Sequence, residues 1–181
     1  MSRLSLALLF AFASMAQDPK YKIGRAAGAE DIAAKDITVL SDGRGLPPGS
    51  GTASQGREIY ERRCQKCHGN QGQGGEEGPA LAGGNGSLTG PKPVKTVGSY
   101  WPHATTLFDY TRRAMPFDRP GTLTDDQVYA LTARMLFLNG LIGETDAMDA
   151  KTLAQVKMPN RDGFVRDNRP DTKGGKAVKA K

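Results

Sequence analysis

Two cysteines and a histidine lie within five consecutive residues, Cys64-Gln65-Lys66-Cys67-His68. This C-x-x-C-H run is the signature of covalent c-type haem attachment. On one helical turn both cysteines lie on the same side, where each can form a thioether with a haem vinyl group. The histidine follows immediately and can offer an imidazole nitrogen to the iron. The spacing predicts one covalently bound haem c, attached through Cys64 and Cys67, with His68 as an axial ligand.

The same residue types could serve three other chemistries. A thioredoxin-like redox pair requires a βαβ context, and the flanking sequence shows no strands around the motif. A zinc site usually takes four Cys or His ligands; His103 completes that number, but the spacing matches no common zinc template. A structural disulfide would leave the adjacent histidine without a role. Haem attachment is the interpretation that uses all three residues.

A methionine is the favoured second axial ligand, because a thioether is a soft donor that suits haem iron. Met115 follows a predicted helix and precedes a proline, which can hold the sulfur in a loop over the second haem face. Met158 also precedes a proline, and His103 would give a bis-histidine site, so both remain alternatives. Two other methionines lie inside a predicted helix and in a polar segment, Met135 and Met148.

Three further residues could position the haem. An iron-bound imidazole needs its other nitrogen held by an acceptor, and the Pro79 carbonyl in the run Gly78-Pro79-Ala80-Leu81 is a suitable one. The alternative is a plain turn that places Leu81 in the core. Tyr100 and Trp101 each carry a polar hydrogen that could reach a haem propionate, although ordinary core packing is the commoner use of such aromatics.

Three helices are predicted around these residues. The first is capped by Ser54 and runs into the Cys64 turn, with Gly56 and Tyr60 on one face, where the glycine would allow another helix to cross closely. The second covers Ala104 to Ala114 and follows Pro102. Its inward side chains are predicted to be Leu107, Phe108 and Tyr110.

The third predicted helix has the clearest local signals. Thr124-Asp125-Asp126-Gln127 is a capping box, and Asn139-Gly140 supplies the stop. Apolar residues recur on one face of the helix, at Val128, Leu131, Met135 and Leu138. This helix is the natural partner for the Gly56 face of the first one. The glycine-rich stretch between Gly69 and Gly90 is predicted to be loop.

Composition indicates one small domain rather than two. The 181 residues include 23 glycines and 11 prolines, and only 38% are hydrophobic, so a haem would supply the apolar centre. The formal charge is +6, or +5 once Arg3 is removed with the leader described below, and a basic protein suits an acidic protein partner. Nucleic acid is not favoured, because the charges are scattered and aromatic residues make up only 7%.

The predicted boundaries divide the chain into five parts. Residues 1–16 have a basic n-region, an apolar h-region too short to span a bilayer and a small-residue cleavage site, which predicts a signal peptide and a periplasmic location. Residues 17–51 are an extension expected to pack on the domain or a partner, with a helix at Ala29–Lys35 and a strand at Asp36–Leu40. Residues 52–140 are the haem domain. Residues 141–170 are expected to wrap around the domain and to include a short helix at Ala150–Val156. Residues 171–181 are expected to be a disordered basic tail.

The order of these features resembles the class I cytochromes c over Thr52 to Gly140. It consists of a helix leading into C-x-x-C-H, a Gly-Pro-x-Leu loop, a Met-Pro after an intermediate helix and a capped terminal helix. The resemblance implies an all-α fold, a haem ligated by His68 and Met115 with one exposed edge, and an electron-carrier role. One departure is Arg134, at a position where the family's terminal helix often has an aromatic that packs on the first helix.

A narrower resemblance is to the cytochrome c subunits of bacterial sulfite and sulfane dehydrogenases. It is carried by four segments, 42–51, 93–102, 112–118 and 158–164. It implies that a molybdenum-dependent dehydrogenase subunit donates the electrons and that another cytochrome accepts them. Several members of that group hold two haems, whereas this chain has one C-x-x-C-H. The 158–164 segment either contacts a partner or packs on its own domain.

The function expected from the sequence is outer-sphere electron transfer without catalysis, with no substrate bond broken at the iron. Cations near the haem edge could steer an acidic partner, with Lys66, Lys95, Arg112 and Arg113 as candidates. One rival is a general periplasmic electron shuttle with no dedicated donor. The other is a haem enzyme or ligand sensor, which requires an open iron position.

Overall fold

The computed structural model describes residues 23–165. The chain forms two compact units, and the boundary between them follows Asp36. The predicted signal peptide and the predicted basic tail lie outside the described residues. In the first unit, the helix predicted from Ala29 forms α1 (Ala29–Ala33). Arg25 Nη2 donates to Asp31 Oδ1 over 2.8 Å and thereby ties the start of this helix to the preceding segment.

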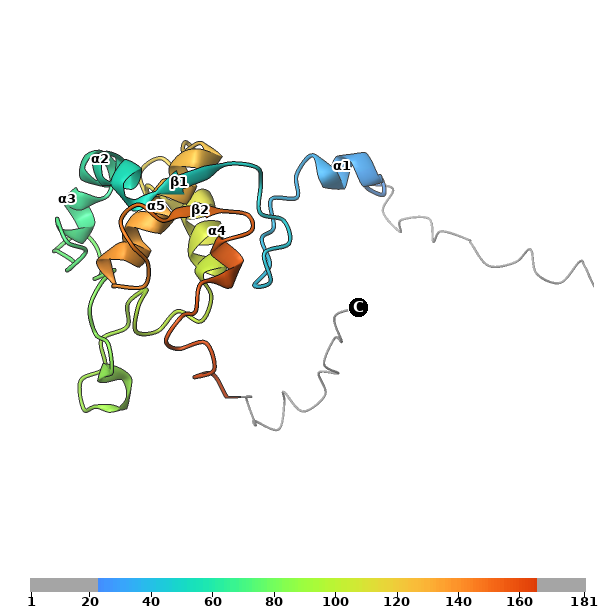
Figure 1. Ribbon diagram of the computed structural model, residues 1–181. Helices are drawn as coiled ribbons and strands as arrows, with labels where there is room; N and C mark the ends of the chain where they lie inside the picture. The colour runs from blue at the N-terminus through green and yellow to red at the C-terminus, as the bar shows by residue number, and fades with distance from the viewer. Residues whose placement is uncertain (1–22, 166–181) are drawn as a thin grey trace, which may run out of the picture. The chain divides into compact units, whose positions relative to one another are not determined.

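The second unit, from Ile37 onward, is mostly helical (Figure 1). The all-α expectation is confirmed, with the addition of a small antiparallel ribbon in which Ser50 lies opposite Asp149. The elements in chain order are β1 (Ser50–Thr52), α2 (Ala53–Arg63), α3 (Gln65–His68), the 3₁₀ helix η1 (Ser87–Thr89), α4 (Ala104–Ala114), α5 (Asp125–Leu138), β2 (Ala147–Asp149) and the 3₁₀ helix η2 (Leu153–Gln155).

Both long helices that meet at the core begin with a capping box. The α5 box is confirmed: Gln127 N–H donates to Thr124 Oγ1 at 3.3 Å, and Thr124 N–H donates to the Gln127 side chain at 3.0 Å. For α2 the prediction that Ser54 caps the helix is wrong. Thr52 is the N-cap, because it keeps an extended backbone while its side chain accepts from Gln55 N–H.

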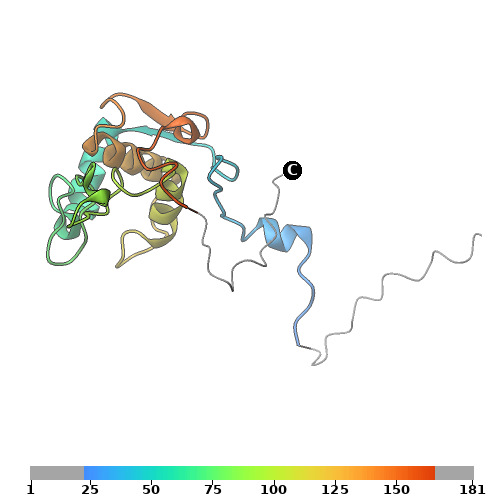
Figure 2. The same ribbon diagram turned by 90° about the horizontal axis from the view of Figure 1, so that it is seen from below.

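Helices α2 and α5 cross closely at Gly56, which confirms the predicted helix contact (Figures 1 and 2). Gly56 is buried, and a Cβ atom there would collide with the Ala130 carbonyl and lie 2.9 Å from Arg134 Cβ. Tyr60, one turn later, is fully buried at the same interface. Only a residue without a side chain allows the two backbones to come this close.

Helix α4 has the predicted bounds but not the predicted inward face. Leu107 and Phe108 are buried as expected, whereas Tyr110 is 48% exposed. The buried face instead continues to Thr111, because residues four apart lie above one another on a helix. Tyr110 packs edge-on against Trp101, with ring centroids 5.7 Å apart.

The predicted strand at 36–40 is wrong, because these residues have no regular secondary structure. In the second unit, Leu40 and Arg44 close a turn in which Leu40 N–H donates to the Arg44 carbonyl. Val39 is buried, and Tyr129 Oη donates to the Pro47 carbonyl at 2.8 Å. The helix expected at 150–156 is limited to the 3₁₀ turn η2.

The 158–164 segment also packs on its own unit. Met158 is buried, and Asn160 Nδ2 donates to the Tyr100 carbonyl at 2.7 Å. Phe164 lies edge-on to the Tyr100 ring, with centroids 5.2 Å apart. Within residues 23–165, no helix is long and apolar enough to cross a membrane.

Candidate functional site

The C-x-x-C-H run forms a separate helical turn directly after α2. Cys64 ends α2, with its N–H donating to the Tyr60 carbonyl at 2.8 Å, and α3 then carries Cys67 and His68. His68 N–H donates to the Cys64 carbonyl at 3.0 Å, which closes the turn. Both cysteines are free and half-buried, so the two thiols are displayed from one turn without being joined to each other.

The loop after the motif fixes the orientation of the His68 ring. Its Nδ1 lies 2.8 Å from the Pro79 carbonyl oxygen. Because a carbonyl only accepts, Nδ1 must carry the hydrogen, and Nε2 keeps its lone pair for a metal. Gly78 permits this approach, since a Cβ there would lie 3.1 Å from His68 Cε1 and 3.0 Å from the Cys67 carbonyl.

Both thiols are held in their neutral form. Burial, with a smaller contribution from Cys67, raises the pKa of Cys64 to about 11. The pKa of Cys67 is also raised, chiefly by its hydrogen bond to Glu77, whose Oε2 lies 3.4 Å from Sγ. Zinc binding needs thiolates, and within residues 23–165 no cluster of three His, Cys, Asp or Glu is placed to hold a metal ion. These observations do not support the zinc alternative.

Met115 ends α4 in an extended conformation and is half-buried. Asp118, three residues later, has a small electrostatic effect on Cys67, in which its negative charge helps to raise the pKa of that thiol. The Met115 sulfur, a soft donor, therefore lies three residues before Asp118, whose charge acts on Cys67 of the attachment turn. This arrangement is compatible with a ligand supplied to the second face of a haem.

The rival ligands lie in different surroundings. Met158, like Met135 and Met148, is buried among the apolar residues of the protein core. His103 is half-buried at the start of α4, and its Nδ1 is buried with no hydrogen-bond partner among the described residues. Of the methionines within residues 23–165, Met115 is the one outside the packed core, and His103 is a second candidate donor outside it.

Tyr100 and Trp101 are half-buried and use their rings rather than their polar hydrogens for protein contacts. Tyr100 packs on Phe164, and the Lys95 ammonium lies 4.9 Å from its ring centroid. Within the described residues, neither Tyr100 Oη nor Trp101 Nε1 donates a hydrogen bond to another protein group. Both donors are therefore available to a group the protein holds.

These residues fit a covalently bound haem. The turn offers two unjoined neutral thiols, His68 has its Nε2 free, and a thioether is available near the same turn. The unpartnered buried nitrogen of His103 and the free Trp101 hydrogen are consistent with a polar group being present beside α4.

Comparison with known proteins agrees with this site. Residues 51–133 match a family model described as cytochrome c oxidase, cbb3-type, subunit III. The fold and the site define a class I cytochrome c with covalently bound haem c, and this chain belongs to that family. It is similar to a chain in the crystal structure of the sulfane dehydrogenase SoxCD from Paracoccus pantotrophus. The two share 45% identity with a TM-score of 0.77, over 86% of this chain and 76% of that one. No curated protein sequence matches the chain significantly.

Two residues of the site were missed by sequence reasoning. Glu77 accepts from Cys67 and pairs with Lys66 at 3.3 Å, and Asp118 acts on Cys67 from beyond Met115. Asp118 was noted only as the end of the 112–118 segment, and no local pattern indicates that either residue acts on Cys67. The glycine at position 78 was part of a noted run, but its closeness to the His68 ring was not foreseen.

Proposed function

We propose that this electron-transfer protein is a periplasmic one-haem cytochrome that accepts electrons from a molybdenum-dependent sulfur-oxidising dehydrogenase and passes them to another cytochrome. The observation that carries the proposal is the 45% identity to a chain of a sulfane dehydrogenase over most of both chains. Periplasmic export rests on the predicted signal peptide. The dehydrogenase performs the chemistry on sulfur, and this chain has no catalytic role.

In this proposal Cys64 and Cys67 form the thioethers, and His68 and Met115 are the axial ligands. Bound haem c supplies a one-electron Fe(III)/Fe(II) couple. The Pro79 carbonyl fixes the His68 ring and increases the basicity of its Nε2 by accepting from Nδ1–H over 2.8 Å. The Met115 thioether would bind the iron, so that electrons would pass without a substrate bound at the metal. Tyr100 and Trp101 would donate to the propionates.

One haem limits the protein to one electron at a time. The oxidation of sulfite to sulfate releases two electrons, so the donor must deliver them singly and this chain must be reoxidised between them. Fast and repeated docking would suit such a cycle. Electrostatic steering speeds encounter, and salt weakens it.

The structure limits which cations can contribute to steering. Arg112 pairs with Asp125 at 3.0 Å, Arg113 pairs with Asp109 at 2.9 Å, and Lys66 pairs with Glu77. Three of the four candidate cations are thus partly neutralised by a neighbouring carboxylate. Lys95 has no carboxylate partner among the described residues and is the strongest remaining candidate.

The proposal is tested by following the ferrous α-band of the haem when sulfite or thiosulfate is added to the ferric protein with periplasmic extract from its own source. Rapid reduction that disappears in extract depleted of molybdoenzymes is the expected result. Reduction by a chemical donor, but by neither anion with complete extract, would contradict the sulfur-oxidation role. Comparable reduction by unrelated donors would favour the general shuttle.

A further inference from the structure

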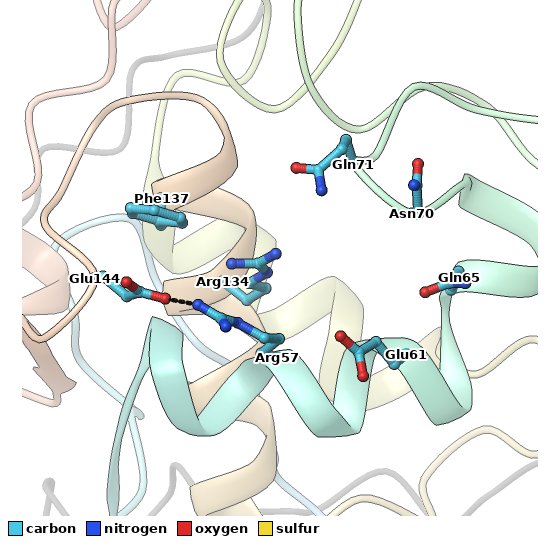
Figure 3. A pocket seen from close by; sticks show the side chains of 8 residues that line it. All are labelled: Arg57, Glu61, Gln65, Asn70, Gln71, Arg134, Phe137 and Glu144. Carbon is cyan, nitrogen blue, oxygen red and sulfur yellow. Dashed lines mark hydrogen bonds and ion pairs between the residues drawn. The ribbon is translucent and has the colours of Figure 1, made fainter.

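A polar pocket of about 670 Å³ lies where α2 and α5 cross, and none of its lining residues attaches or ligates the haem, although Gln65 belongs to the C-x-x-C-H turn (Figure 3). Its walls come from α2, α3, α5 and the loop after α3. The residues that matter here are Arg57, Glu61, Gln65, Asn70, Gln71 and Arg134. Most of the rim is exposed, so the pocket is reached from solvent.

Arg134 is the unusual residue of this pocket. It is only 7% exposed, and its Nε is buried with no hydrogen-bond partner. Its stem packs against Gly56, and its guanidinium lies 5.4 Å from the Phe137 ring centroid. Figure 3 shows the guanidinium end directed into the pocket, toward Gln71. The position that often holds an aromatic in related proteins therefore holds a nearly buried charge.

No carboxylate neutralises this charge within the described residues. Glu144 is paired with Arg57 instead, as the dashed line in Figure 3 marks. Glu61, the other acid of the pocket, makes no ion pair among the described residues. In Figure 3, Arg57 lies between Glu61 and Phe137. A buried guanidinium without a counter-charge is costly, and an anion would remove that cost.

Amide donors complete the arrangement. The side chains of Gln65 and Gln71 make no hydrogen bond to protein among the described residues. Asn70 uses its Oδ1 to accept from Gln73 Nε2 at 2.9 Å, which leaves its NH₂ group free. Neutral N–H donors that line the same pocket as a guanidinium form a suitable environment for several oxygens that share a negative charge.

We propose that this pocket binds a small inorganic oxyanion, such as sulfate, with the Arg134 guanidinium taking two of its oxygens and the amide groups of Gln71 and its neighbours taking the others. The site borders the haem turn through Gln65, but it uses no residue that attaches or ligates the haem, and it does not depend on which donor reduces the protein. A failed donor assay would leave it intact, and its own failure would leave the electron-transfer role intact.

The primary test is calorimetric titration of the full haem-containing chain with sodium sulfate, at ionic strength held constant with sodium chloride. Saturable binding is expected for the wild type, and Arg134→Gln should weaken it by about tenfold or more. Arg62→Gln is the matched control, because Arg62 lies on α2 outside the pocket and pairs with Glu58. It should bind sulfate like the wild type. No saturable binding to the wild type, or equal binding to Arg134→Gln, overturns the proposal.

A second variant guards against loss of binding through misfolding. Glu61 contributes a carboxylate to the pocket that repels an anion, so Glu61→Gln should tighten sulfate binding roughly two- to fivefold. A damaged fold cannot produce tighter binding. Weaker or unchanged binding in Glu61→Gln would overturn the assignment.

Discussion

At the scale of single residues, one hydrogen bond decides which nitrogen of His68 can bind a metal. The Pro79 carbonyl takes Nδ1–H at 2.8 Å, and Gly78 makes room for that contact. The same loop places Glu77 against Cys67. The attachment turn is therefore organised by a loop about ten residues later in the chain, through Glu77 and the Pro79 carbonyl.

Replacing Met115 by alanine should open the iron to external ligands. The ferrous variant is expected to bind carbon monoxide readily, whereas the wild type should not, and its midpoint potential should fall because a thioether ligand raises it. Absorbance spectra under carbon monoxide and a redox titration measure both effects. His103→Gln is the control, since it leaves the Met115 sulfur in place. If carbon monoxide bound to ferrous His103→Gln but not to ferrous Met115→Ala, the ligand would be His103 and the Met115 assignment would be wrong.

Tyr60 should make the protein sensitive to alkali. Burial raises the pKa of the Tyr60 hydroxyl from its usual 10.0 to about 12, so the unfolded chain loses this proton at lower pH than the folded one. The contribution of the protonated Tyr60 hydroxyl to the free energy of unfolding is fully present below pH 10. It is lost as the pH rises toward 12.

Tyr60→Phe should be less stable at pH 7, by about 1 kcal/mol, since it loses the 2.9 Å bond to the Gly69 carbonyl. It should then lose less stability than the wild type between pH 7 and 10.5, as measured by denaturant unfolding. An identical loss in both proteins would assign the alkaline sensitivity to other groups.

At the scale of elements, the crossing of α2 and α5 depends on a missing side chain. Gly56→Ala would gain about 1 kcal/mol of helix propensity. It would also push a methyl group into the Ala130 backbone, and overpacking of this kind costs more than the gain. A net loss of about 1–3 kcal/mol in unfolding free energy is expected. Ser54→Ala, at an exposed position of the same helix, should be neutral or stabilising. Equal stability of the two variants would show that the helices can separate at little cost.

The capping box of α5 should contribute measurably to stability, because this helix is buried along most of its length. Thr124→Ala removes the acceptor for Gln127 N–H and is expected to cost about 1 kcal/mol. Thr124→Ser should recover most of the loss, since it keeps the hydroxyl. Thr106→Ala, exposed in α4, serves as the comparison for a threonine without a capping role. Thermal unfolding of the four proteins distinguishes capping from general packing.

At the scale of the whole molecule, residues 37–51 belong to the same unit as the haem turn. A chain that begins at Ile37 should therefore be more stable than one that begins at Thr52. The shorter chain loses the buried Val39, the Tyr129 bond to Pro47 and the Ser50 strand pairing. A difference of about 2 kcal/mol or more is expected from one buried valine and one hydrogen bond. If the two chains unfold in the same transition, residues 37–51 do not contribute to the stability of the folded unit.

Short-range signals carried most of what could be predicted from the sequence. The haem turn, the Thr124 capping box and the bounds of α4 each depend on residues within a few positions of one another, where spacing alone constrains geometry. The close crossing of another helix at Gly56 was also predictable, because Gly56 shares a helix face with Tyr60 and has no side chain to keep the second helix away. The expected all-α class came from the resemblance to class I cytochromes c that the order of these signals carries.

The tertiary structure decided everything that depends on how distant segments meet. Ser50 pairs with Asp149, Tyr129 bonds to Pro47, and Tyr110 faces outward, and no local pattern distinguishes these outcomes from the alternatives. The role of Arg134 is of the same kind. The sequence showed only an arginine in place of an aromatic; its burial without a counter-charge results from Gly56 on another helix and from Arg57 holding Glu144. The reason is physical: the path of the loops sets which side chains share a space, and a loop's path depends on the whole fold rather than on its own residues.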